Sequence, residues 1–157
     1  MKENIFSNTE AAVDPAQLDD FEAKVGRKLP DEFRAHYLKY NGGVPDRTYY
    51  VGAEIEEPLE VASFKPISNA PSNLLSTYLS MRDKQVIPGN LLPFANDWGG
   101  NYFCLNLESG LISYFTTDNF YSELSYEENQ KKSETTICSS FTSFVQELVH
   151  EEDLYES

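Results

Sequence analysis

Apolar residues recur at helical spacing near the start of the chain, and the residues around them are typical of helix ends. Leu18, Phe21 and Val25 lie at i, i+3 and i+7, which places them on one face of a helix. Asp14-Pro15 suits the cap and first turn, and Gly26 can adopt the left-handed conformation that ends many helices. The pattern predicts a helix between these two signals.

A second helix is predicted to begin at Pro30, with an acidic pair in its first turn that complements the positive end of the helix. Phe33, Tyr37 and Tyr40 follow at helical spacing and are expected to face the core. The glycine-rich segment 41–43 ends this helix. Two helices therefore open the domain.

The periodicity then changes to short β-rich segments. Residues 48–51 and 61–67 are predicted strands, which we expect to pair in antiparallel fashion across an acidic loop. Residues 72–82 return to a helical pattern, with Leu75, Tyr78 and Leu79 on one side. Helix and strand signals thus alternate in the middle of the chain.

The strongest strand signals are the runs 91–95, 101–107 and 111–115, and the last two are separated by a short loop of hairpin length that contains glycine. The clearest helical pattern comes near the C-terminus, behind a cap at Ser139-Ser140. Its apolar positions are Phe141, Phe144, Val145, Leu148 and Val149.

Together these elements predict an α+β fold in one domain. A mainly antiparallel sheet is flanked by the N-terminal helices, a middle helix and a C-terminal helix. We expect an N-terminal arm at 1–13, the domain itself at 14–150 and an acidic C-terminal tail at 151–157.

Charge narrows the choice of partners. The 157 residues include 26 acidic and 12 basic side chains, which gives a formal net charge of −14. This charge repels phosphate backbones and anionic membrane surfaces, so neither nucleic acid nor a membrane is an expected direct partner. A basic protein would instead be attracted over a long range and oriented before contact.

The chain begins without the apolar core of a signal peptide, and no apolar run approaches the roughly 18–20 residues of a membrane span. A cytoplasmic location is therefore expected.

Candidate catalytic and metal-binding groups are few. Cys104 and Cys138 lie far apart in the sequence and outside any metal-binding spacing, so both are expected to be buried thiols. His36 and His150 fall in predicted helices without a nucleophile beside them. We therefore expect neither a metal nor a cofactor, and a protein that is not an enzyme.

The segment around the only tryptophan is the leading candidate for a contact with another protein. Trp98 follows a predicted strand and precedes a Gly-Gly turn, so the ring either anchors an interface or caps the core. Asp97 and Asn101 flank it and can form directional hydrogen bonds. Both are included in the predicted contact surface.

Two further contacts are predicted near residue 50. Tyr49 and Tyr50 are consecutive strand residues and must face opposite sides, so only one can meet a partner, and Tyr50 is taken as the contact. The acidic loop that follows contributes Glu54, Glu56 and Glu57, which can steer a cationic partner or serve only as solubilising charge.

Two stretches carry a resemblance to a known family. Residues 29–33, Leu-Pro-Asp-Glu-Phe, running into Tyr-Asn-Gly-Gly-Val-Pro at 40–45, resemble the first signature of the SUKH superfamily in its Smi/Knr-like branch. Residues 92–97, Leu-Pro-Phe-Ala-Asn-Asp, followed by Gly-Gly-Asn-Tyr-Phe-Cys-Leu at 99–105, resemble the second. One departure is clear, because residues 114–118 replace the Trp-Asp-His-Glu-like run that the family often carries.

The resemblance implies a SUKH-like α+β fold and a role in binding proteins without catalysis. Most bacterial members resemble immunity proteins encoded beside polymorphic toxins, which implies a cognate toxin protein as the partner, with a basic nuclease domain as one candidate. A yeast member acts as a docking partner in cell-wall regulation. The alternative implied here is therefore a regulatory scaffold that docks cellular proteins.

Overall fold

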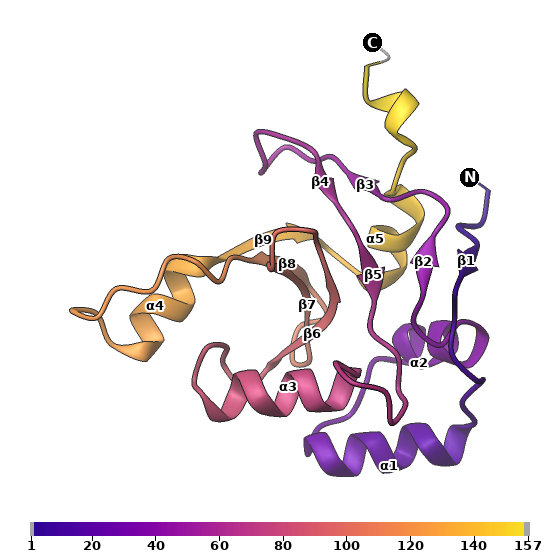
Figure 1. Ribbon diagram of the computed structural model, residues 1–157, viewed down its shortest axis with the longest axis horizontal. Helices are drawn as coiled ribbons and strands as arrows, with labels where there is room; N and C mark the ends of the chain where they lie inside the picture. Colours follow the sequence, from indigo (N-terminus) through magenta and orange to yellow (C-terminus); the bar gives the residue numbers. More distant parts are fainter. Residues whose placement is uncertain (1, 156–157) are drawn as a thin grey trace.

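A curved antiparallel sheet of five strands forms the centre of the computed structural model, which describes residues 2–155 (Figure 1). The strands follow one another in the sheet in the same order as in the sequence, from β5 at one edge to β9 at the other. Their bounds are β5 Ser63–Phe64, β6 Leu91–Asn96, β7 Tyr102–Asn106, β8 Ile112–Phe115 and β9 Glu134–Cys138.

Helices cover this sheet, and a short 3-10 helix at Glu151–Tyr155 follows the last of them. Their bounds are α1 Pro15–Val25, α2 Asp31–Lys39, α3 Leu74–Asp83, α4 Tyr126–Ser133 and α5 Phe141–Glu147. No helix within residues 2–155 has the length and apolar character that a membrane span requires.

Aromatic side chains join α2 and α5 to one face of the sheet. The ring of Phe94 in β6 lies 5.1 Å from that of Phe141 and 6.3 Å from that of Phe33, measured between centroids. Phe103 in β7 meets Phe144 at 5.3 Å on the same side. This aromatic layer is the centre of the core, while α3 contacts β6 and α1 contacts α3.

Two small ribbons complete the fold. The first pairs β1 (Phe6–Ser7) with β2 (Val44–Pro45), and the second pairs β3 (Tyr49–Tyr50) with β4 (Leu59–Glu60). Phe6 is buried against the aromatic layer, with its ring 4.8 Å from that of Phe64. The segment before residue 14 therefore contributes directly to the core.

The predicted α+β class is confirmed, as are the first two helices, the middle helix, the C-terminal helix and the strands β6 to β8. At the first helix, Asp14 accepts a 2.8 Å hydrogen bond from the amide of Gln17, and Gly26 ends the helix at φ +82°. The residues that predicted the two ends of this helix thus form its caps in the structure.

The pairing predicted for the middle segments is wrong in register. Residues 48–51 were expected to pair with 61–67, but β3 pairs with Leu59–Glu60, and Ser63–Phe64 joins the central sheet beside β6. The sequence pattern also does not predict α4 and β9, which lie between the β7–β8 hairpin and α5.

Candidate partner-binding surface

The turn between β6 and β7 carries the tryptophan and is held by its two flanking polar residues. The Asp97 carboxylate accepts hydrogen bonds from the amides of Gly99 at 2.8 Å and Asn101 at 2.9 Å. The backbone amide of Asp97 in turn donates to the carbonyl of Asn101 at 3.0 Å. The turn is therefore closed on both sides of Trp98, and Gly100 permits the reversal at φ +86°.

Strand β8 and the loop after it fix the turn from outside. The Tyr114 hydroxyl donates to the Asp97 carboxylate, and the Asn101 side-chain amide donates to Tyr114 Oη at 3.1 Å. Thr117 adds two contacts, since its amide donates to Asn101 Oδ1 at 3.0 Å and its hydroxyl to the Gly100 carbonyl at 2.9 Å. The turn is thereby tied to a segment more than ten residues away in the sequence.

The charge state of the turn follows from these contacts. Partial burial opposes ionisation of Asp97, but hydrogen bonds from Tyr114, Asn101 and Gly99 outweigh it and lower the pKa of the carboxyl. Burial, reinforced by the neighbouring carboxylate, raises the pKa of Tyr114. At neutral pH the pair is therefore a carboxylate that accepts from a neutral phenol.

Trp98 itself lies outside the core. Its side chain is 76% exposed, the highest exposure among the large hydrophobic residues in the part of the chain described. Of the two alternatives that the sequence left open, the core position is thus wrong. Asp97 and Asn101 direct their side-chain polar groups into the turn, where they fix the backbone on either side of Trp98.

Tyr50 requires a correction. It is predicted to contact a partner, but it is only 3% exposed and its hydroxyl donates to the Ile137 carbonyl at 2.6 Å. Its ring also stacks on Phe144 at 5.3 Å. Of the two consecutive tyrosines, Tyr50 is the one inside, because β3 turns that face toward α5 and β9.

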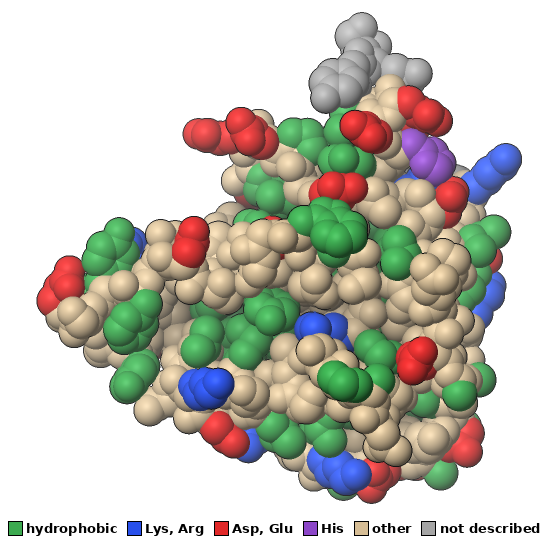
Figure 2. All heavy atoms as spheres, viewed as in Figure 1, with side chains coloured by type: hydrophobic (Ala, Val, Ile, Leu, Met, Phe, Trp, Pro, Cys, Tyr) green, Lys and Arg blue, Asp and Glu red, His purple; other side chains and the backbone are tan. Residues whose placement is uncertain are grey.

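The acidic loop is exposed and lies beside a second acidic segment. Tyr49 and Val149 exchange backbone hydrogen bonds of 3.0 and 2.8 Å, which brings the β3–β4 loop and the C-terminal segment to one edge of the molecule. Figure 2 shows acidic side chains gathered along this edge. We call it the acidic rim, and it consists of Glu54, Glu56, Glu57, Glu151, Glu152 and Asp153.

The carboxylates of the acidic rim are not neutralised within the protein. Among residues 2–155, no Lys or Arg side chain forms an ion pair with any of them. In contrast, several carboxylates on the helices are paired, for example Asp20 with Lys24 at 3.0 Å. The rim is therefore one part of the surface where several carboxylates without a cationic partner lie together.

The two histidines lie in different environments. His36 is packed among aromatic rings, including Phe6 at 4.8 Å and Phe141 at 5.1 Å, and its Nε2 atom is buried without a hydrogen-bond partner. Burial lowers its pKa to about 4. His150 lies at the surface, 3.5 Å from Asp46. Neither is placed beside a nucleophile.

The remaining candidate groups are structural. Cys104 and Cys138 are both free and buried, as predicted. Among the described residues, no three His, Cys, Asp or Glu side chains come together to hold a metal ion. The assembled features are thus an exposed aromatic turn and an acidic rim, which suit contact with another protein.

Tyr114 and Thr117 are the residues of this surface that sequence reasoning missed. Their roles depend on the register of the β7–β8 hairpin, which pairs Tyr114 with Phe103. The loop length at 108–110 fixes that register in principle, so the hairpin was the available signal.

The structure is thus a small α+β domain with an exposed aromatic turn and an acidic rim, and comparison with known proteins identifies its family. The chain belongs to the SMI1/KNR4 family (SUKH-1), whose pattern it matches over residues 12–147. It is also similar to a SPbeta prophage-derived uncharacterized protein, YokK, of Bacillus subtilis (strain 168). The two are 28% identical over an alignment of 153 positions, and the match covers 86% of this chain and 74% of the relative.

Proposed function

We propose that this protein is an immunity protein that binds a cognate polymorphic bacterial toxin in the cytoplasm and neutralises it by occluding its active site. The action is binding without catalysis. Membership of the SUKH-1 family supports this class of function, since immunity proteins of toxin systems are found in it.

The observation that carries the proposal is the exposed Trp98 on a turn fixed by hydrogen bonds. Large aromatic residues dominate the binding energy of many interfaces, and a turn whose backbone is already held in place loses little entropy on binding. Here the Asp97 carboxylate and the Tyr114 hydroxyl supply that rigidity before any partner arrives.

The acidic rim supports a basic toxin, with a nuclease domain as the leading candidate. Nucleases bind phosphates through cationic surfaces, and carboxylates can occupy the same positions. Unpaired surface charge also accelerates the encounter of oppositely charged proteins. The rim thus contributes to capture, and Trp98 contributes to retention.

The test is co-expression with the product of the adjacent gene, followed by co-purification and a growth assay. We expect the two proteins to purify together and growth to be restored, and Trp98→Ala to weaken both effects. Leu38→Ala, which truncates another exposed apolar residue, is the matched control. A stable complex without growth protection would favour the alternative, a regulatory scaffold that docks cellular proteins.

A further inference from the structure

Two residues on one face of the central sheet, Asn96 and Tyr102, are only partly buried, whereas Phe115 on the same face is buried. Phe103 points toward α5, and because neighbouring strand residues alternate, Tyr102 faces the opposite side. Directly paired residues share a face, so Asn96, Tyr102 and Phe115 form a row across three strands on that side. We call this row, with the groups at its two ends, the trough.

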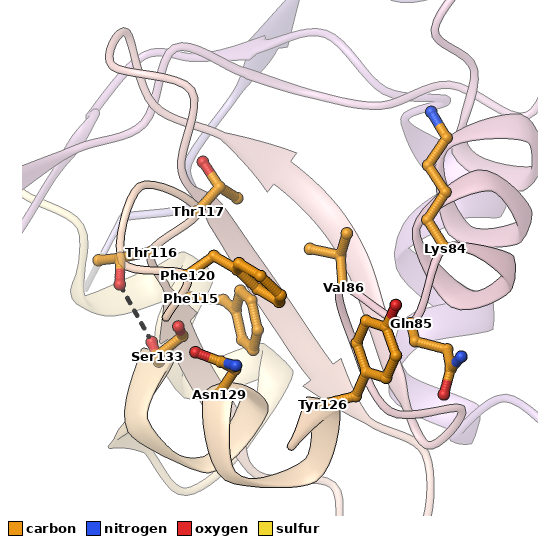
Figure 3. Close-up of a pocket in the computed structure, with 10 residues that line it drawn as sticks. All are labelled: Lys84, Gln85, Val86, Phe115, Thr116, Thr117, Phe120, Tyr126, Asn129 and Ser133. Carbon is orange, nitrogen blue, oxygen red and sulfur yellow. Dashed lines mark hydrogen bonds between the residues drawn. The ribbon is translucent and has the colours of Figure 1, made fainter. Parts of the chain in front are cut away.

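One end of the trough is an apolar pocket between the end of α3 and α4. The pocket has a volume of about 170 Å³, and Figure 3 shows side chains from three separate segments pointing into it. Its apolar walls are Val86, Phe115, Phe120 and Tyr126. A cavity of about 150 Å³ can hold a benzene-sized molecule, so this pocket fits one leucine or aromatic side chain.

Part of the pocket wall is exposed to solvent. Phe120 is 62% exposed, and its ring lies 6.2 Å from that of Tyr126. Val86 is also among the exposed large hydrophobic residues. Figure 2 shows hydrophobic side chains on the floor of the hollow between α3 and α4. Adjacent exposed apolar groups of this kind typically mark a site of interaction.

The other end of the trough is a lysine inside the fold. Lys65 directly follows β5, its side chain is 9% exposed, and its ammonium donates to the Ser72 carbonyl at 3.3 Å. The ammonium also lies 5.8 Å from the centroid of the Tyr102 ring. An ammonium has three donors, and no other protein acceptor is in hydrogen-bond range among the described residues.

This lysine has no acidic partner, although the protein is rich in carboxylates. Lys24, Lys28, Lys39 and Lys131 each form an ion pair, whereas no Asp or Glu within residues 2–155 lies within 4.0 Å of Lys65. Lys84, which borders the pocket, is likewise unpaired in the same range of residues. Although the chain has a net charge of −14, the trough thus contains two lysine ammonium groups without a carboxylate partner.

We propose that the trough binds an extended, acidic segment of a partner protein, with one apolar side chain in the pocket beside Phe115 and a carboxylate at Lys65. The complementary charge argues for this occupant, since a buried ammonium with one carbonyl acceptor and no carboxylate partner gains most from a carboxylate. From β5 to β8 the trough crosses three strand spacings, about 14 Å, which an extended peptide spans with about four residues.

The trough differs from the acidic rim in the charge it selects. The rim favours a cationic surface, whereas the trough favours a segment that carries carboxylates. The rim and the trough can bind the same partner or two different partners. The two sites can therefore be tested separately.

The experiment is selection of a random dodecapeptide display library on the purified protein, followed by affinity measurement on the enriched peptides by fluorescence anisotropy. We expect enrichment of peptides that place Asp or Glu about four residues from Leu or Phe. Phe120→Ser combined with Val86→Ser should weaken their binding by about tenfold or more, as should Lys65→Met. Leu38→Ser and Lys28→Met are the matched controls, and they should change the affinity for the enriched peptides little.

A second measurement does not depend on the folding of any variant. Replacing the peptide carboxylate by its amide should weaken binding to the unmodified protein by about tenfold, the range of a charge-assisted hydrogen bond. Enrichment of basic peptides, binding that the trough variants leave unchanged, or no enrichment would each overturn the proposal. Because the library contains no toxin, failure of the immunity assay leaves this outcome unaffected, and the reverse also holds.

Discussion

The Tyr114 hydroxyl donates a hydrogen bond to the Asp97 carboxylate, so that a residue of β8 fixes the turn between β6 and β7. The two residues are 17 positions apart in the sequence. Through this contact the central sheet determines the position of Trp98, whose side chain is otherwise surrounded mainly by solvent. The rigidity of the candidate contact is therefore a property of the sheet as well as of the turn.

Removing this hydroxyl should loosen the turn. Tyr114→Phe leaves the Asp97 carboxylate short of one donor, and we expect a loss of about 1–2 kcal/mol in the free energy of unfolding. Trp98 is the only tryptophan in the chain, so its fluorescence anisotropy decay reports directly on the turn and should become faster. Tyr121→Phe, which alters an exposed tyrosine, is the control. An unchanged anisotropy decay would show that the turn does not need Tyr114.

Truncating the exposed ring should affect binding and leave folding nearly intact. Trp98→Ala is expected to weaken the complex with the toxin by at least about 2 kcal/mol, the usual magnitude for a central interface residue. If the tryptophan were buried, truncating it would instead lower the free energy of unfolding by about 3–5 kcal/mol. Affinity and melting temperature measured on the same variant separate the two effects. A lower melting temperature with unchanged affinity would remove Trp98 from the interface.

Stability should fall in mild acid because of His36. Its pKa is about 4 in the folded protein against 6.5 ordinarily, so the unfolded chain takes up the proton first as the pH drops. The stability that neutral, buried His36 contributes to the fold is fully present above pH 6.5 and is lost between pH 6.5 and about 4. By the size of this shift, the loss reaches about 3 kcal/mol.

Urea unfolding at about pH 7 and about pH 4.5 measures this dependence. His36→Leu should reduce the difference between the two conditions, since it removes the titrating group and also an Nε2 atom that has no partner. Glu3 and Lys39 are the charged residues that act on His36, and both stay in place. His150→Gln is the control. If His36→Leu and the unmodified protein lose equal stability, burial of His36 is not the cause.

The acidic rim should act on the rate of association. Replacing Glu54, Glu56 and Glu57 by glutamine should slow capture of a basic partner at low salt and flatten its salt dependence, because charge steering is screened over about 8–10 Å at ordinary salt. The dissociation rate should change little. The control removes the same number of charges elsewhere, with Glu10→Gln, Asp31→Asn and Glu123→Gln. Equal slowing by both sets would assign the effect to net charge alone.

Much of the fold could be predicted because local chemistry specifies it. The Asp14 cap, the Gly26 end and the apolar spacing of α5 are all visible in a single segment of sequence. The polar helix α4 has no apolar stripe, and β9 is an edge strand with exposed threonines, so neither shows the periodicity of a buried element. Ser125 and Glu128 do form a capping box at α4, and that was the signal available.

The candidate site was harder to predict because it depends on contacts between distant segments. Alternation along β3 requires one of Tyr49 and Tyr50 to be buried, but it does not indicate which. The acidic rim forms only because Tyr49 pairs with Val149, about a hundred residues later. For Trp98, the composition of the turn was visible, whereas the contact from Tyr114 of β8 that fixes Asp97 joins segments 17 positions apart.

The central claim is that this protein neutralises a toxin by forming a complex with it. Titration of the purified protein into an activity assay of the toxin domain encoded by the adjacent gene tests this claim most directly. We expect inhibition to rise linearly and to be complete at one molecule of protein per molecule of toxin, with activity recovered when the complex is separated. Activity that is unaffected at stoichiometric excess, or that is destroyed by a small fraction of an equivalent, would contradict it.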